Sequence, residues 1–290
     1  MLGQQVVNGV MLGSVYATVA VALTLSIGVL NFLNFSIPGL FMIGGMTTWA
    51  LISQGVPWPL AAVGALFVVA ICSLLVERFT WRWMRGAEPF VPLVSSMAFL
   101  ILFEHLAIAY FGSDMRVVSG FAQSDLRIAG LVIAIPQLIG LVFCVGLIFA
   151  LSLLLKKTRL GRGLRTIAED SNTALLLGVD INRLVPIVFV VAGLFAAFAG
   201  VLFALNYRQV HPFMGEAVGL KGIAAMIVGG MGNIWGSILG GLIIGICEVL
   251  AIGYLGANLV DIAVYGLLLL ILFFRPTGLL SGMPAARGGI

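Results

Sequence analysis

The fold is decided by residues 9–29, which read GVMLGSVYATVAVALTLSIGV and include no charged side chain. A helix of about 20 apolar residues crosses the hydrocarbon core of a bilayer. Because hydrocarbon offers the backbone no hydrogen-bonding partner, a crossing segment must satisfy its own N–H and C=O groups as a helix. The preceding residues, MLGQQVVN, lack the cationic start of a signal peptide. We therefore expect this first run to be retained as a membrane span.

The remainder of the chain repeats this apolar pattern. Hydrophobic residues occupy 61% of the 290 positions and charged residues 9%, whereas soluble domains contain roughly 45–50% and about 25% of these classes. Apolar stretches cover residues 9–29, 37–53, 58–77, 92–111, 131–155, 186–205, 217–231, 234–254 and 257–274. The seventh stretch is only about 22 Å long as a helix, so we expect a half-helix that leads into a broken segment.

The sequence therefore predicts an all-α polytopic membrane protein with residues 1–290 as a single transmembrane domain. About eight helices span the bilayer, or nine if residues 217–231 cross as well. A weak internal repeat supports broken segments in both halves. The sequence FMIGGM of residues 41–46, followed by Trp49, resembles AMIVGGM of residues 225–231, followed by Trp235. Paired interrupted segments often mark a transport path at a repeat interface.

Basic residues predict how the chain is oriented. The connection after the fifth apolar stretch carries Lys156, Lys157, Arg159, Arg162, Arg165 and Arg183, whereas residues 112–130 balance two arginines against two aspartates. Cytoplasmic loops are enriched in Lys and Arg, so we expect residues 156–185 to form a cytoplasmic loop. Counting spans places Arg78, Arg82, Arg85, Arg275 and Arg287 on the same side. No basic stripe with interleaved aromatic residues is present, so we expect contact with membrane lipid and not with nucleic acid.

This loop also predicts an amphipathic helix. Apolar and small residues recur at helical spacing at Leu164, Ile167, Ala168, Ser171, Ala174 and Leu175, with charged and polar side chains between them. Such a helix can lie on anionic lipid headgroups. It can also dock in the groove of a soluble partner, which the acidic Glu169 and Asp170 favour. Gly161, Gly163 and Gly178 are placed where the ends of the segment would bend.

Several motifs, in order along nearly the whole chain, resemble those of permeases of branched-chain amino acid ABC importers. The loop residues Gly163, Arg165, Ala168, Asp170, Ala174, Gly178, Asp180 and Arg183 resemble their cytoplasmic coupling loop. The sequence NGVMLGSVY of residues 8–16 resembles their opening motif, and VGGMGNIWG of residues 228–236, LGGLIIG of residues 239–245 and RPTGL of residues 275–279 resemble their C-terminal half. One departure is in NFSIPG of residues 34–39, because Ser36, Ile37 and Pro38 replace the family's common histidine-containing sequence.

The resemblance implies partners as well as a fold. Permeases of this family have broken central helices and work in the bacterial inner membrane with two ATP-binding cassette ATPase subunits and an extracytoplasmic substrate-binding protein. It implies that residues 163–178 press into the ATPase, with Gly163, Arg165, Ala168, Glu169, Asp170, Ala174 and Gly178 as coupling residues. From the chain's length we expect a heterodimer with a sister permease, with a homodimer as the alternative. The implied solutes are branched-chain or related amino acids, amides or urea.

Ionisable residues inside apolar stretches need a physical reason, because a charge at mid-bilayer costs about 2.5 to 3.5 kcal/mol on insertion scales. Glu104, His105, Glu248 and Asp261 are such residues. Each could be buried and paired, or could act in transport. For the translocation path we select Asn34, Ser36, Asn233 and Glu248, since the helix breaks near the first three expose backbone groups. The alternative for Asn34, Ser36 and Asn233 is that they cap or turn the broken helices.

The source of energy separates the remaining functions. No G-x-x-x-x-G-K-[ST] sequence is present, so we expect no ATP-binding loop of its own, and ATP hydrolysis is expected in separate subunits. An ion-coupled secondary transporter of a small polar solute is the alternative to an ABC permease. We expect no enzyme activity, cofactor or metal site, because Cys72, Cys144 and Cys247 and the two histidines have no ligand spacing.

Overall fold

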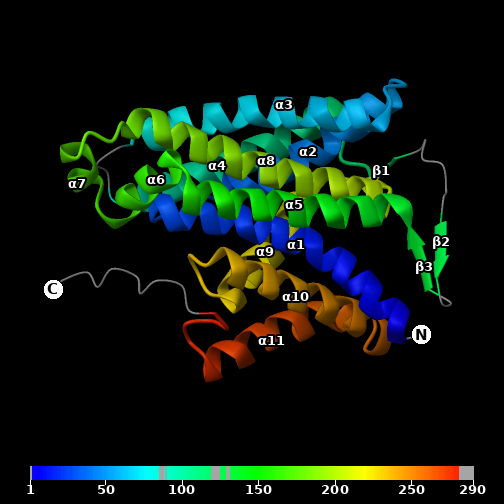
Figure 1. The fold of residues 1–290 in the computed structure, drawn as a ribbon. Helices are drawn as coiled ribbons and strands as arrows, with labels where there is room; N and C mark the ends of the chain where they lie inside the picture. Colours follow the sequence, from blue (N-terminus) through cyan, green and yellow to red (C-terminus); the bar gives the residue numbers. More distant parts are fainter. Residues whose placement is uncertain (1, 85–87, 89, 119–124, 129–130, 281–290) are drawn as a thin grey trace.

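The computed structural model describes residues 2–84, 88, 90–118, 125–128 and 131–280, and it confirms an all-α membrane fold (Figure 1). Within these residues, eight helical segments are long and apolar enough to span a bilayer. They are α1 (Leu2–Leu30), α2 (Ser36–Ser53), α3 (Trp58–Val76) with its continuation η1 (Glu77–Arg82), α4 (Phe90–Phe111), α5 (Ile135–Lys157), α8 (Ile181–Tyr207), α10 (Ile234–Tyr254) and α11 (Val260–Phe274), which follows η2 (Ala257–Leu259).

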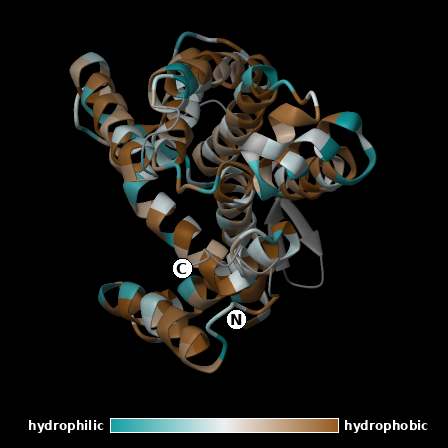
Figure 2. Cartoon of the chain, turned by 90° about the vertical axis from the view of Figure 1, so that its left-hand side faces the viewer, coloured by the Kyte–Doolittle hydropathy of each residue, from teal (hydrophilic) through white to brown (hydrophobic). Residues whose placement is uncertain are grey.

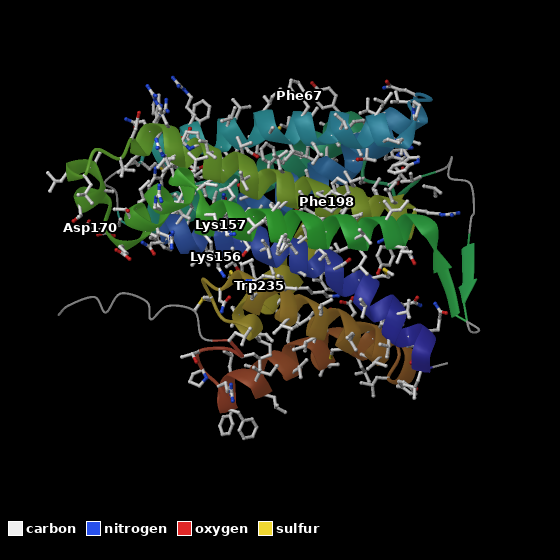
Figure 3. All side chains as sticks on the ribbon, viewed as in Figure 1. Phe67, Lys156, Lys157, Asp170, Phe198 and Trp235 are labelled. Atoms are coloured by element: carbon white, nitrogen blue, oxygen red, sulfur yellow. The ribbon has the colours of Figure 1, made fainter. Side chains whose placement is uncertain are left out.

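The outer helices present apolar side chains to their surroundings. Large hydrophobic residues are exposed along α3, α4, α5 and α11, for example Phe67, Phe143 and Phe273. Phe67 points away from the bundle in Figure 3. Seen from the end that carries α6 (Arg159–Glu169) and α7 (Ser171–Leu176), the helices are mostly hydrophobic and the hydrophilic residues gather in connecting segments (Figure 2). This arrangement fits a bundle surrounded by hydrocarbon, where an apolar outer surface has no cost.

Glycines bring the central helices into backbone contact. Gly9 and Gly13 of α1 face Gly241 and Gly245 of α10, with a four-residue spacing on each helix. A Cβ atom at Gly13 would lie 2.8 Å from the Cα atom of Leu242. Such small residues let membrane helices approach closely. Close approach increases van der Waals packing, which drives helix association in lipid because the hydrophobic effect does not. The first span and a span near the C-terminal end therefore form one packed seam.

The predicted half-helix is α9 (Met214–Gly229), whose 16 residues extend about 24 Å. It ends at a turn in which Gly230 and Gly232 have φ angles of 111° and 83°, values that a residue with a side chain rarely adopts. The matching stretch of the internal repeat differs, because Gly44 lies inside the uninterrupted helix α2. The break in the N-terminal half comes earlier, between Leu30 and Ser36.

One span boundary in the sequence analysis was wrong. Residues 131–155 were expected to form one apolar helix, but Leu131–Ala134 form strand β3, which pairs antiparallel with β2 (Asp125–Ile128). Helix α5 begins only at Ile135. Its second residue is Pro136, and proline is tolerated in the first turn of a helix because the N–H it lacks would have no helical partner there. A second short pair joins β1 (Arg116–Val117) to β4 (Gln209–Val210).

Hydrogen bonds define which segments share one end of the bundle. Asn31, just after α1, contacts Ala168 of the loop helix α6 (Arg159–Glu169). The segment after α11 reaches the α9–α10 turn, where Leu279 and Leu280 donate backbone N–H groups to Val228 and Gly229. A Cβ atom at Gly28 of α1 would lie 3.9 Å from Gly232 of that turn. Residues 275–280 thus lie at the same end as residues 156–185; Arg85 and Arg287 lie outside the described residues.

Candidate functional site

The polar loop contains two helices where the sequence predicted one. Helix α6 ends at Glu169, and α7 (Ser171–Leu176) follows after Asp170. Asp170 has an extended backbone with φ −158°, and its carboxylate accepts hydrogen bonds from the backbone N–H and the hydroxyl of Thr173 at 3.2 and 2.5 Å. An aspartate in this position satisfies N–H groups that a helix start leaves free. Asp170 therefore separates the two helices and caps the start of α7.

The face that each loop residue presents follows from this break. Leu164, Ile167 and Ala174 are buried, as a single amphipathic helix would also require. Leu175 was placed on the same face but is exposed, because the change of direction at Asp170 rotates α7 out of register. The coupling candidates Arg165, Glu169 and Asp170 are exposed, and Ala168 is half-buried. The neighbouring Leu176 and Leu177 are 88% and 69% exposed, so α7 and the residue after it present an apolar surface.

The loop glycines have separate structural roles. Gly163 faces the base of α8, where a Cβ atom would lie 2.7 Å from Cδ1 of Leu184. Gly178 has a φ angle of 77° and open space around it. It closes the segment after α7 because its N–H donates to the carbonyl oxygen of Leu175. The first glycine is thus needed for close packing, and the second for a left-handed backbone.

Three of the four residues selected for the path lie at helix starts. The side-chain oxygen of Asn34 accepts from the Ser36 N–H at 3.0 Å and from its hydroxyl at 2.7 Å, and both residues are buried. The side-chain oxygen of Asn233 accepts from the N–H groups of Trp235 and Gly236 at 3.0 and 3.3 Å, which caps α10. These bonds turn the chain at the two breaks in the helices.

The fourth residue, Glu248, lies in a cavity of about 490 Å³ between α1, α5, α8, α9 and α10. Lys221 of α9 donates to its Oε1 at 2.6 Å, and the Tyr16 hydroxyl of α1 donates to its Oε2 at 2.7 Å. The other polar side chains that line the cavity are Asn8, Gln137, Asn206, Tyr207 and Gln209. Asn34, Ser36 and Asn233 are not among its lining residues, so the structure separates Glu248 from the other three path candidates.

The ion pair is buried at mid-bundle. The side chains of Lys221 and Glu248 are only 14% and 9% exposed, and Tyr16 and Lys221 lie near the middle of α1 and α9. Removing a charge from water costs several kcal/mol, and a nearby opposite charge offsets this cost. Lys221 is therefore the cation that offsets the burial of the Glu248 carboxylate. Asp261 of α11 adds a second, mostly exposed carboxylate 3.7 Å from Lys221.

Lys221, which pairs with Glu248 in this cavity, was not among the residues predicted from the sequence. It lies inside the apolar stretch of residues 217–231, and the cost of a charge in such a stretch applies to lysine as much as to glutamate. The same cost argument would therefore have selected Lys221 as a candidate residue. No comparable local signal existed for Tyr16, which meets Glu248 across 232 positions of the chain.

The remaining ionisable candidates lie apart from this cavity. Glu104 of α4 is buried, and its Oε1 has no hydrogen-bond partner among the described residues. The neighbouring His105 is exposed, with its Nδ1 2.9 Å from the carbonyl oxygen of Ile101 on its own helix. In the part of the chain that the structure describes, no group of three His, Cys, Asp or Glu side chains could hold a metal ion.

Comparison with known proteins identifies the family to which this architecture belongs. Residues 5–273 match the family described as branched-chain amino acid transport system / permease component. The chain is 31% identical to the high-affinity branched-chain amino acid transport system permease protein BraD of Pseudomonas aeruginosa, over 96% of this chain and 95% of that protein. It is 32% identical to the LivH permease of Escherichia coli K12, with the same coverage.

A more distant relative carries a different solute in its name. The D-allose transport system permease protein AlsC of Escherichia coli is 27% identical, over 73% of this chain and 65% of that protein. The match to the branched-chain family extends over most of the chain, including α1, α9 and α10, which form the charged cavity. This chain is therefore a multi-pass membrane protein that belongs to the family of permease components of branched-chain amino acid transport systems.

Proposed function

We propose that this chain is the membrane-spanning subunit of an ATP-driven importer of branched-chain or closely related amino acids. The observation that carries the proposal is the polar cavity around Lys221 and Glu248 inside a chain of this family. The relatives BraD and LivH are named as high-affinity branched-chain amino acid permeases. A cavity of this size lies within the roughly 300–1,000 Å³ of small-molecule sites, which leaves room for an amino acid and water.

ATP hydrolysis is assigned to two separate ATPase subunits that dock on α6 and α7. The exposed Leu176 and Leu177 offer an apolar contact, and the exposed Arg165, Glu169 and Asp170 of the same loop offer charged ones. An interface with an apolar centre and a polar rim is typical of specific protein contacts. Gly163, Ala168, Ala174 and Gly178 would set the position of these two helices on the ends of the spans. We assign residues 163–178 to the coupling contact.

This docking implies an orientation. The loop end of the bundle, with Lys156 and Lys157 at the end of α5 (Figure 3), is assigned to the cytoplasm because of its basic residues. Residues 275–280 lie at the same end, and we extend the cytoplasmic assignment to the C-terminus that follows them. The opposite end, with β1 and β4, would receive solute from an extracytoplasmic binding protein. The bacterial inner membrane is the assigned location, and a sister permease completes a heterodimer.

The helix breaks are assigned to the movement that opens the path. Asn34 and Ser36 turn the chain into α2, and Asn233 starts α10. Each break leaves a point where neighbouring helices can change angle without breaking a continuous helix. Glu248 lies on α10, so rotation of that helix about Asn233 would displace the charged cavity.

Reconstitution tests this proposal against ion-coupled transport. The complex of this chain with its ATPase subunits, sister permease and binding protein is expected to accumulate radiolabelled L-leucine in proteoliposomes only when ATP is supplied. Liposomes that contain this chain alone are expected to accumulate no L-leucine under a proton or sodium gradient. Accumulation driven by either gradient without ATP would overturn the proposal in favour of a secondary transporter.

A further inference from the structure

The cavity holds both members of an ion pair side by side. Lys221 Nζ and Glu248 Oε1 are 2.6 Å apart, and both residues line the cavity. Tyr16 donates to the second carboxylate oxygen and so fixes the orientation of Glu248. An α-amino acid carries the same two charges on adjacent groups. The cavity therefore presents a charge pattern complementary to a zwitterion.

We propose, on the basis of the proposed import function, that Lys221 and Glu248 recognise the ammonium and carboxylate of a zwitterionic amino acid in the path. The solute carboxylate replaces Glu248 beside Lys221, and the solute ammonium replaces Lys221 beside Glu248. Both pairs are ionic hydrogen bonds, which are about twice as strong as neutral ones. The exchange leaves every charge paired and the net charge of the cavity unchanged.

The same geometry rejects other solutes. An uncharged sugar can replace neither member of the ion pair, so it would have to bind without separating Lys221 from Glu248. A carboxylic acid can replace only Glu248 beside Lys221, which leaves the Glu248 carboxylate buried without its cation and is strongly unfavourable. An amine can replace only Lys221 beside Glu248, which leaves Lys221 with the mostly exposed Asp261 carboxylate at 3.7 Å in place of the buried Glu248 at 2.6 Å. The wrong solute is rejected because it leaves a charged side chain of the protein poorly paired.

The rest of the cavity wall fits an aliphatic side chain. Met11 and Leu12 of α1, Val218 of α9, and Val249 and Ile252 of α10 line it next to the charged pair. These residues come from the three helices that carry Tyr16, Lys221 and Glu248. An amino acid held by its charged groups would therefore place a branched apolar side chain against an apolar surface.

Binding without the external protein tests the inference directly. The complex of this chain with its sister permease and ATPase subunits is placed in lipid nanodiscs, without the binding protein. Saturation-transfer NMR then compares L-leucine with 3-methylbutylamine, which lacks the carboxylate, with 4-methylpentanoate, which lacks the ammonium, and with D-ribose. The unmodified complex is expected to prefer L-leucine by about tenfold over each of the others. No L-leucine binding, or ribose binding of equal strength, would overturn the inference.

Substitutions assign the two charges separately. Glu248→Gln is expected to remove the preference for L-leucine over 4-methylpentanoate, since no carboxylate remains to be paired with the ammonium. Lys221→Met is expected to remove the preference over 3-methylbutylamine. The exchanged pair Lys221→Glu with Glu248→Lys keeps both charges and is expected to keep preference for the zwitterion. Preferences unchanged in the two single variants would show that the pair is structural and overturn the inference.

A matched control separates recognition from packing. Thr24→Val removes a buried hydroxyl contact with Ser237 that also joins α1 to α10 but lies outside the cavity, so solute preference should not change. ATP-driven uptake of L-leucine is measured in parallel. Uptake by the unmodified complex together with unchanged preferences in the single variants would overturn only the recognition by Lys221 and Glu248. Absence of uptake would overturn the import function itself.

Discussion

Asn31 donates a hydrogen bond from its side-chain nitrogen to the carbonyl oxygen of Ala168 at 3.2 Å. This bond joins the end of α1 to α6, the first helix of the proposed coupling loop. The same α1 carries Tyr16, which binds Glu248, and packs through Gly9 and Gly13 against α10. A displacement of α6 by an ATPase would therefore reach the charged cavity through one rigid helix.

Asn31→Gly tests this connection. Asn31 has a φ angle of 58°, which glycine adopts freely, so the substitution removes the hydrogen bond without straining the backbone. We expect ATP hydrolysis by the assembled complex to persist, while L-leucine uptake per ATP falls about fivefold. This factor is at the lower end of the effects that coupling between two sites typically produces. Ser53→Ala serves as a control, because the Ser53 hydroxyl donates to the carbonyl oxygen of Ala50 within the same helix, α2. Unchanged uptake per ATP in Asn31→Gly would contradict the connection.

Gly163→Leu should loosen ATPase docking while the spans stay folded. A side chain at residue 163 would meet Leu184 of α8 and push α6 away from the bundle. We expect recovery of ATPase subunits in a pull-down to fall about tenfold, which corresponds to 1.4 kcal/mol. Leucine substitutions at Ala168 and Gly178 are expected to act in the same direction. Unchanged recovery for all three would remove the coupling assignment of residues 163–178.

Gly13→Leu should destabilise the membrane domain itself. The new side chain would meet the backbone of α10 at Leu242, and overpacking typically costs about 1–3 kcal/mol. Thermal unfolding in detergent, followed by the fluorescence of a thiol-reactive dye that labels the buried Cys144 once unfolding exposes it, should show a lower Tm. Gly146→Leu is the matched control, because a Cβ atom at Gly146 of α5 has open space around it. Equal Tm values for the two variants would rule out the proposed backbone contact as a source of stability.

Asp170→Ala should unfold α7 locally. The substitution removes the carboxylate that accepts from Thr173, and loss of such a cap costs about 1 kcal/mol. We expect the amides of α7 to exchange with deuterium about fivefold faster, with no change in the membrane spans. Asp170→Asn can keep the cap and is expected to retain most of the protection. Equal exchange in both variants and the unmodified chain would mean that the cap is not needed.

The membrane spans could be predicted from sequence because each depends only on its own length and apolarity. The short helix α9 was predicted by the same reasoning, because residues 217–231 form a shorter apolar stretch than the other spans; whether this stretch crosses the bilayer was left open. The start of α5 and the break between α6 and α7 could not be predicted in this way. Apolar residues continue through Leu131–Ala134, so the apolar pattern does not reveal that these residues form a strand. Helical spacing continues through Asp170, so the spacing does not reveal the break between α6 and α7.

The candidate site was predicted only in part. Glu248 was selected because a carboxylate in an apolar run is costly, and the structure places it in a polar cavity. Asn34, Ser36 and Asn233 were selected from the breaks beside them. The side chains of Asn34 and Asn233 accept from backbone N–H groups at those breaks, and the Ser36 hydroxyl donates to the Asn34 side chain. The cavity depends on contacts between α1, α9 and α10. A local sequence pattern holds no information on pairings between segments more than 200 residues apart.

The glycine seam between α1 and α10 sets an order for biosynthesis. Gly9 and Gly13 emerge from the ribosome first, but their partners Gly241 and Gly245 are made more than two hundred residues later. During that interval the small-residue face of α1 has only lipid, other early helices or the insertion machinery as neighbours. A chain that is truncated before residue 234 would keep this face open permanently.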